Sequence, residues 1–272
     1  MINIKEKTIV SKRSDGTECE DGLFISNDFI CVVDGVTSKG KWTFDGHTSG
    51  YYAKELVLKG MENMPADISG EEAVLRLNQC IADGYTPERR EEALHNSDEK
   101  IQANIIIYSV SKKQIWSFGD CQCIINGEFF AHEKIFDVVL SRARALYLET
   151  ERICGKTEAE LLAHDTGREF ILPLLKKQSL LENAESKYCI VNINGFEIDP
   201  CRIIKYDLHS GDEIVLASDG YPQLKPTLAE SEKILAETLK RDPLCCKEYL
   251  STKGLKEGNA SFDDRTYISF TV

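Results

Sequence analysis

The sequence lacks any long hydrophobic run and is poor in positive charge. None of its 272 residues belongs to a stretch approaching the roughly 20 apolar residues of a membrane-spanning helix. Lys and Arg number 33 against 45 Asp and Glu, so the formal net charge is −12. Nucleic-acid binding depends on neutralising phosphates with basic side chains, so this balance argues against it, and against an anionic membrane surface. We therefore expect no nucleic-acid partner and no membrane partner.

Several common catalytic and metal-binding motifs are also missing. The five histidines form no His-x-x-x-His pair, and the ten cysteines form no Cys-x-x-Cys pair. The sequence has neither a glycine-rich phosphate loop nor a Gly-x-Ser-x-Gly nucleophile elbow. The N-terminus has no apolar signal-peptide core, and Cys31 and Cys189 lie within apolar strand patterns. These features predict a cytoplasmic protein with reduced thiols.

Hydrophobic periodicity predicts groups of strands that alternate with groups of helices. Strands are predicted over residues 3–10, 23–27, 29–34, 102–110, 113–119, 121–126, 128–131, 188–194, 202–207, 213–218 and 265–271. Helices are predicted over residues 48–62, 70–84, 136–152, 157–180, 228–240 and 243–252, and over part of 87–100. Asn126-Gly127 predicts a hairpin turn, and Pro173 predicts a kink or break.

This order of elements is typical of an α+β fold, in which helices cover antiparallel sheets. No linker composition interrupts the chain. We therefore predict one domain over residues 1–272, with a helical insert near 136–186.

Two of the predicted strands end in the same dipeptide, Asp34-Gly35 and Asp219-Gly220. A buried strand fixes the backbone of such an aspartate and leaves its carboxylate at the strand end. Carboxylates gathered there repel one another unless a cation binds them. A plain turn is the alternative for a single Asp-Gly, but two such units favour a site for hard divalent cations.

Three further acidic motifs occur along the chain. Each alone fits a turn or a solvated surface. In chain order the full series is Glu20-Asp21, Val33-Asp34-Gly35, Phe118-Gly119-Asp120-Cys121, Ala217-Ser218-Asp219-Gly220 and Asp263-Asp264-Arg265-Thr266. In this order and spacing, the series resembles the PPM-type, or type 2C, family of metal-dependent protein serine/threonine phosphatases. The resemblance extends over residues 3–271.

The resemblance implies a four-layer sandwich of two central antiparallel β-sheets flanked by α-helices. It also implies two Mg²⁺ or Mn²⁺ ions and a metal-activated water that attacks a phosphomonoester, with a third, weaker ion in some members. The implied metal ligands are Asp34 as the bridge, the Gly35 carbonyl, Glu20 and Asp21 at one ion, Asp219 and Asp263 at the other, and Asp120 with Asp219 at the third. Asp34 and Asp219 would thus carry catalysis.

The residues on the substrate side depart from the family pattern. The usual phosphate-binding arginine is replaced by Gly16, and Arg13 is the nearby candidate for that contact; a solvated side chain is its alternative. Cys19 and Cys121 replace the usual Asn and Ser. The predicted function is a protein phosphoserine/phosphothreonine phosphatase with a phosphoprotein substrate. The alternatives are a pseudophosphatase that binds a partner or phosphoprotein without turnover, and a phosphatase of small metabolites. The oligomeric state stays open.

Overall fold

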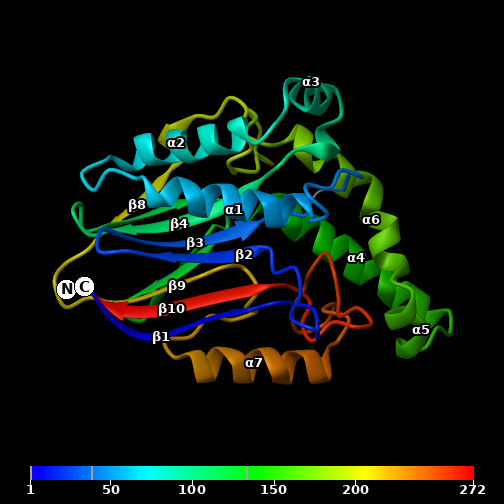
Figure 1. Ribbon diagram of the computed structural model, residues 1–272. Helices are drawn as coiled ribbons and strands as arrows, with labels where there is room; N and C mark the ends of the chain where they lie inside the picture. Colours follow the sequence, from blue (N-terminus) through cyan, green and yellow to red (C-terminus); the bar gives the residue numbers. More distant parts are fainter. Residues whose placement is uncertain (1, 38, 133) are drawn as a thin grey trace.

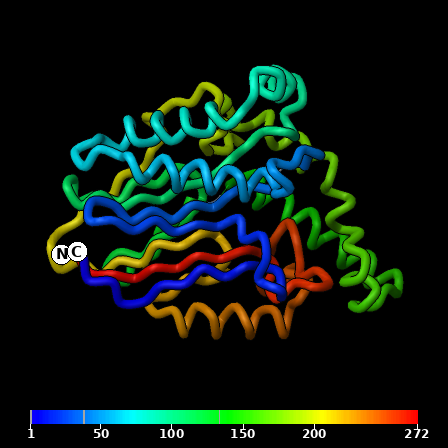
Figure 2. Tube along the Cα trace, viewed as in Figure 1, coloured from blue at the N-terminus to red at the C-terminus, as the bar shows by residue number. Residues whose placement is uncertain are grey.

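Two antiparallel five-stranded sheets form the centre of the computed structural model, which describes residues 2–37, 39–132 and 134–272 (Figure 1). The first sheet contains, in spatial order, β1 (Asn3–Val10), β10 (Arg265–Thr271), β9 (Glu213–Ala217), β6 (Gln122–Ile125) and β7 (Glu128–Ala131). The second sheet contains β2 (Asp21–Ile25), β3 (Phe29–Gly35), β4 (Ala103–Ser109), β5 (Gln114–Phe118) and β8 (Ile204–Asp207). The chain ends are close together because Asn3 pairs with Thr271 (Figure 2).

The sheets pack face to face, and strand alternation decides which side chains lie between them. Along β3, Ile30 and Val32 join a buried cluster that includes Leu216 and Phe270 of the first sheet. The intervening residues of β3 point the other way, toward the helices, as the two-residue period of a strand requires. This run is apolar on both faces because β3 is covered on both sides.

Helices form the outer layers of the sandwich. In Figure 1, α1 and α2 cover the outer face of the second sheet, and α7 lies along the first. The helices are α1 (Ser49–Glu62), α2 (Gly70–Asp83), α3 (Pro87–His95), α4 (Ile135–Ile153), α5 (Glu158–Ala163), α6 (Thr166–Lys177) and α7 (Leu228–Arg241). The short 3₁₀ helices are Ser97–Glu99, Gln178–Leu180 and Pro200–Arg202. The α+β four-layer prediction is therefore confirmed.

The helices α4, α5 and α6 lie together at one end of the sandwich (Figure 1). One buried side chain, Arg144 of α4, holds them to the distant segment 242–253. Its guanidinium pairs with Asp165, with an Nη2–Oδ2 distance of 2.7 Å. Its Nη1 donates to the carbonyls of Cys245 at 3.2 Å and Ser251 at 2.9 Å. Arg144 therefore fixes the position of a loop that reaches the candidate site.

The strand predicted over residues 188–194 is wrong. In the structure, Ile190 and Ile193 form only isolated bridges. Asparagine side chains compete for the backbone here, because the Asn78 amide oxygen accepts from the N–H groups of both Asn194 and Gly195. Side-chain bonds of this kind offer the backbone an alternative to a sheet.

The helix predicted over residues 243–252 is also wrong. The Asp242 carboxylate accepts hydrogen bonds from the backbone N–H groups of Cys246, Lys247 and Glu248. Cys245 has a left-handed backbone with φ of 49°, which ends any helix at that point. The segment is a tight loop that closes around the carboxylate of Asp242.

The long helix predicted over residues 157–180 is divided, but not at Pro173. It stops at Ala163 and begins again at Thr166, while Pro173 lies inside α6. Asp165 causes the division, since its side chain accepts from the Arg168 N–H at 2.8 Å and so caps a new helix.

No helix in the described ranges is long and apolar enough to cross a membrane.

Replacing Arg144 with Met should lower the free energy of unfolding by about 3–5 kcal/mol, because it leaves a carboxylate and two loop carbonyls without their buried partner. Urea denaturation measures this change. Arg142→Met, two residues along the same helix and exposed, is the matched control and should stay within about 0.5 kcal/mol of the parent. Equal effects of the two changes would show that the buried guanidinium does not hold the segment.

Candidate metal centre

The candidate site forms where strands from both sheets end. Asp34 is the penultimate residue of β3 and lies opposite Asn104 of β4. Asp120 follows β5 in the turn that leads into β6, and Asp219 follows β9. The turn before Asp120 needs glycine, since Gly119 has φ of 120°. The two sheets therefore deliver three aspartates to one end of the sandwich.

The three carboxylates converge in space. Asp34, Asp120 and Asp219 each present an oxygen that lies within 4.8 Å of the others. The Asp120 Oδ1 is buried and has no hydrogen-bond partner in the described part of the chain. A hard divalent cation prefers carboxylate oxygens in such a group, so these residues fit Mg²⁺ or Mn²⁺.

Burial and mutual repulsion raise the pKa values of Asp34 and Asp219. Burial, and then the neighbouring charges of Asp120 and Asp263, raise the pKa of Asp34 from 3.8 to about 7. The pKa of Asp219 is held well above its usual range by burial and by the charge of Asp34. The Asn104 amide opposes the shift at Asp34, donating to its Oδ2 at 3.0 Å. A bound cation would favour the ionised forms of these carboxylates.

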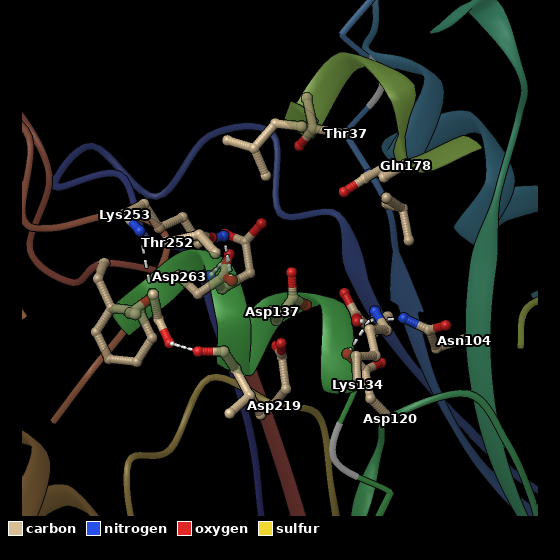
Figure 3. A pocket seen from close by; sticks show the side chains of 18 of the residues that line it. Thr37, Asn104, Asp120, Lys134, Asp137, Gln178, Asp219, Thr252, Lys253 and Asp263 are labelled. Atoms are coloured by element: carbon tan, nitrogen blue, oxygen red, sulfur yellow. Dashed lines mark hydrogen bonds and ion pairs between the residues drawn. The ribbon is translucent and has the colours of Figure 1, made fainter. Parts of the chain in front are cut away.

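Lysine ammonium groups stand at the edges of the cluster. Lys134 pairs with Asp120 at 2.5 Å, and Lys253 pairs with Asp263. In Figure 3 these two pairs lie on opposite sides of the cavity, with Asp219 and Asp137 between them. The chain therefore supplies part of the positive charge that the carboxylates require.

The predicted ligand Glu20 lines the same cavity but is already bound by side chains of the protein. Its Oε2 accepts from the Lys12 ammonium at 2.9 Å and from the Thr37 hydroxyl. Its Oε1 accepts from Thr48 at 2.6 Å. The same ammonium also reaches Asp264 at 3.1 Å. Lys12 therefore acts as a counter-ion for the acidic group at residues 20 and 263–264.

Asp21 and Gly35 have different positions. Asp21 is 3% exposed, lies outside the cavity lining and accepts from the Ser218 hydroxyl at 2.5 Å. Gly35 does line the cavity, where its backbone runs against Gly50. A Cβ at Gly35 would lie 2.1 Å from the Gly50 carbonyl oxygen, so only glycine permits this contact between β3 and α1. Asp21 thus supports the strand ends, and Gly35 leaves room for the first turn of α1.

Arg13, the candidate for the phosphate contact, lies away from the cavity. The Arg13 guanidinium pairs with Glu18 at 2.5 Å and is absent from the cavity lining. The backbone between these two residues folds back in a turn, with Gly16 at φ of 73°. The cavity has a volume of about 560 Å³ and is lined by basic residues other than Arg13.

Sequence reasoning missed several residues of the site. The missed residues include six that line the cavity: Lys39, Asn104, Lys134, Asp137, Arg168 and Lys253. Asn104 had a detectable signal, because it lies opposite Asp34 on the neighbouring strand. Lys134 and Lys253 had none, since each is at least 10 residues along the chain from the aspartate with which it pairs.

Metal-free protein should lose stability as the pH rises. The Asp34 pKa is raised on folding from 3.8 to about 7, so its contribution is complete below 3.8 and is lost as the pH rises through 7. The range between these two pKa values sets where stability changes, so we expect the melting temperature in EDTA to fall from about pH 5 to about pH 8. Added Mn²⁺ should restore the melting temperature most at the higher pH. Differential scanning fluorimetry measures both effects.

Asp34→Asn should flatten this pH dependence and reduce the Mn²⁺ effect. Asp67→Asn, an exposed change outside the cavity, should reproduce the parent profile. A parent-like slope in Asp34→Asn would contradict the assignment of the pH dependence to this carboxylate.

Comparisons with known proteins agree with this architecture. No protein-family model matches the sequence, and a search of curated proteins finds no match. The structure of the photosystem II phosphatase PBCP matches 100% of this chain and 99% of its own, with 15% identity and a TM-score of 0.51.

Two further structures match with lower scores, and both were solved with metal. The catalytic domain of the serine/threonine protein phosphatase PstP, in complex with two manganese ions, has 13% identity and a TM-score of 0.48. RsbX in complex with magnesium has 12% identity and a TM-score of 0.44. Each comparison covers 100% of this chain and 99% of the other. At 15% identity the match to the phosphatase PBCP shows a shared fold, the sandwich of two antiparallel sheets between helices, and no more.

Proposed function

We propose that this chain is a metal-dependent phosphomonoester hydrolase that acts on phosphoserine or phosphothreonine in proteins. The convergence of Asp34, Asp120 and Asp219 carries the proposal. These carboxylates open into a cavity that basic side chains also line, so a divalent cation and a phosphate ester can meet there. The phosphoprotein as substrate class is what the sequence resemblance implies.

The residues of the chain would hold the metal and keep its ligands in place. Asp34, Asp120 and Asp219 would bind a Mg²⁺ or Mn²⁺ ion, which when bound lowers the pKa of a water and draws charge from a phosphoryl group. Asn104 fixes the orientation of the Asp34 carboxylate through its amide. Lys134 holds Asp120 and balances part of the negative charge. The nucleophile in this scheme is water.

The number of ions depends on Lys12. The resemblance implies an ion at Glu20, Asp21, the bridging Asp34 and the Gly35 carbonyl. The Lys12 ammonium, however, lies against Glu20. A second ion would have to compete with that ammonium, since both need the same carboxylate. We therefore propose a first ion at the three aspartates and a weaker second site at Glu20.

A pseudophosphatase is the second candidate, and the same lysines favour it. Ammonium groups already neutralise Glu20, Asp120 and Asp263. A site balanced in this way retains its fold without metal. Such a protein would bind a phosphoprotein or a regulatory partner without turnover.

The proposal places the protein in the cytoplasm. All ten cysteines belong to the described part of the chain and carry free thiols. A reducing compartment keeps thiols in that state.

A hydrolysis assay tests the enzyme proposal. The full chain should hydrolyse an aryl phosphate and a phosphothreonine peptide with Mn²⁺, and not with EDTA. Asp219→Asn should lower kcat/KM at least about 100-fold, because metal sites lose 10–100-fold even on changes to groups that only support the ligands. Asp67→Asn is the matched control and should keep the parent rate.

The outcomes of this assay separate the alternatives. Lack of metal-dependent turnover with both substrates would reject the enzyme and leave the pseudophosphatase. Hydrolysis of the aryl ester without hydrolysis of the peptide would favour a small-metabolite phosphatase over a protein phosphatase.

Removing the Lys12 ammonium should strengthen the second metal site. Lys12→Met should tighten binding of the second Mn²⁺ by about tenfold or more in calorimetry, because a positive charge a few ångströms away opposes the ion. The first ion should be less affected. Lys177→Met, an exposed change on α6, is the control. Unchanged binding of the second ion in Lys12→Met would show that the ammonium does not compete for Glu20.

A further inference from the structure

Three basic side chains, which form the basic wall of the cavity, lie beside the carboxylates. Lys39 comes from the segment after β3, Arg168 from α6, and Lys253 from the 242–253 segment, and all three line the cavity. They are far apart in sequence and belong to three separate parts of the fold. Their convergence is a property of the tertiary structure.

Two of these cations lack a carboxylate partner. Lys253 pairs with Asp263, but within the described ranges no carboxylate lies at ion-pair distance from Lys39 or Arg168. The Lys39 ammonium donates to the Thr37 carbonyl at 2.8 Å. Arg168 donates through Nη1 to the Thr252 carbonyl at 2.6 Å. Both contacts are to neutral carbonyl oxygens, so they hold the side chains in place without a direct ion pair.

The three cations also repel one another. Burial, and then the charges of Arg168 and Lys253, lower the pKa of Lys39 to about 8. Keeping like charges together in a partly desolvated cavity costs free energy, and a bound anion offsets that cost. The negative charges of Glu20 and Asp263 oppose this shift and raise the pKa of Lys39. The basic wall therefore lies next to carboxylates of the same cavity.

We propose that Arg168 and Lys39 form the binding site for the phosphoryl group of the substrate. This inference rests on the proposed function, whose metal centre it completes. A guanidinium matches phosphate oxygens with two parallel N–H donors, and an ammonium adds a point charge. The ligand class is a phosphomonoester dianion, and the two side chains are substrate-binding residues.

This assignment places phosphate recognition in the helical insert. The family pattern uses an arginine near the first acidic pair, but Gly16 occupies that position here, and Arg13 pairs with Glu18 outside the cavity lining. Arg168 enters the cavity from α6, which Asp165 and the buried Arg144 hold in place. The insert thus supplies the cation that the N-terminal segment lacks.

Binding of inorganic phosphate to the full chain in Mg²⁺ buffer tests the proposal directly. Isothermal calorimetry should show binding to the parent. Arg168→Gln and Lys39→Gln should each raise the phosphate Kd by about tenfold, as expected for losing a hydrogen bond to a charged group. Arg168→Lys should recover part of the loss. Arg142→Gln, an exposed arginine on α4, is the matched control and should bind phosphate as the parent does.

Kinetics with the aryl phosphate provide a second readout. We expect the Arg168→Gln and Lys39→Gln variants to raise KM more than they lower kcat, while the Mn²⁺ affinity stays at the parent value. Circular dichroism identifies any variant that fails to fold. If Arg168→Gln does not fold, Lys39→Gln tests the proposal, because in the part of the chain that the structure describes the Lys39 ammonium donates only to the Thr37 carbonyl, two positions away.

The outcomes separate this inference from the proposed function. Parent-like phosphate Kd and KM in both glutamine variants of an active protein would overturn the inference and leave the phosphatase proposal intact. An inactive protein whose phosphate binding depends on Arg168 would retain the anion site and reject the enzyme. A parent chain that binds no phosphate would overturn the inference.

Discussion

Electrostatic repulsion among carboxylates at the strand ends is the constraint on which the site depends. Asp34, Asp120 and Asp219 are forced together because β3, β5 and β9 end at the same edge of the sandwich. Burial makes their ionisation costly, as the raised pKa of Asp34 shows. Cations must neutralise these carboxylates. Lysine side chains supply part of the positive charge, and the three aspartates form a site that fits a divalent ion.

The distribution of lysines gives the site its individual character. Lys134 pairs with Asp120, Lys253 pairs with Asp263, and Lys12 pairs with Glu20. These ion pairs matter for both proposed functions. They stabilise the metal-free fold, and the same ammonium groups compete with a metal ion for the carboxylates. The relative strength of ammonium and divalent ion at each carboxylate therefore decides between an enzyme and a binding protein.

The helical insert is joined to the site through one buried side chain. Arg144 links α4 to Asp165 at the start of α6 and to the carbonyls of the 242–253 segment. Arg168 and Lys253 lie on the two parts that it joins. Because a fully buried guanidinium requires all its partners, the insert and the loop hold fixed positions relative to each other.

The sequence alone determined most strands, most helices and the aspartates at or just after the ends of β3 and β9, because hydrophobic periodicity and Asp-Gly turns are local signals. It failed at 188–194 and 243–252, where Asn78 and Asp242 take the backbone hydrogen bonds. Only the tertiary structure decided which carboxylates are neutralised and which cations face the cavity. Charge pairing depends on distances between segments far apart in the chain, and no local pattern records those distances.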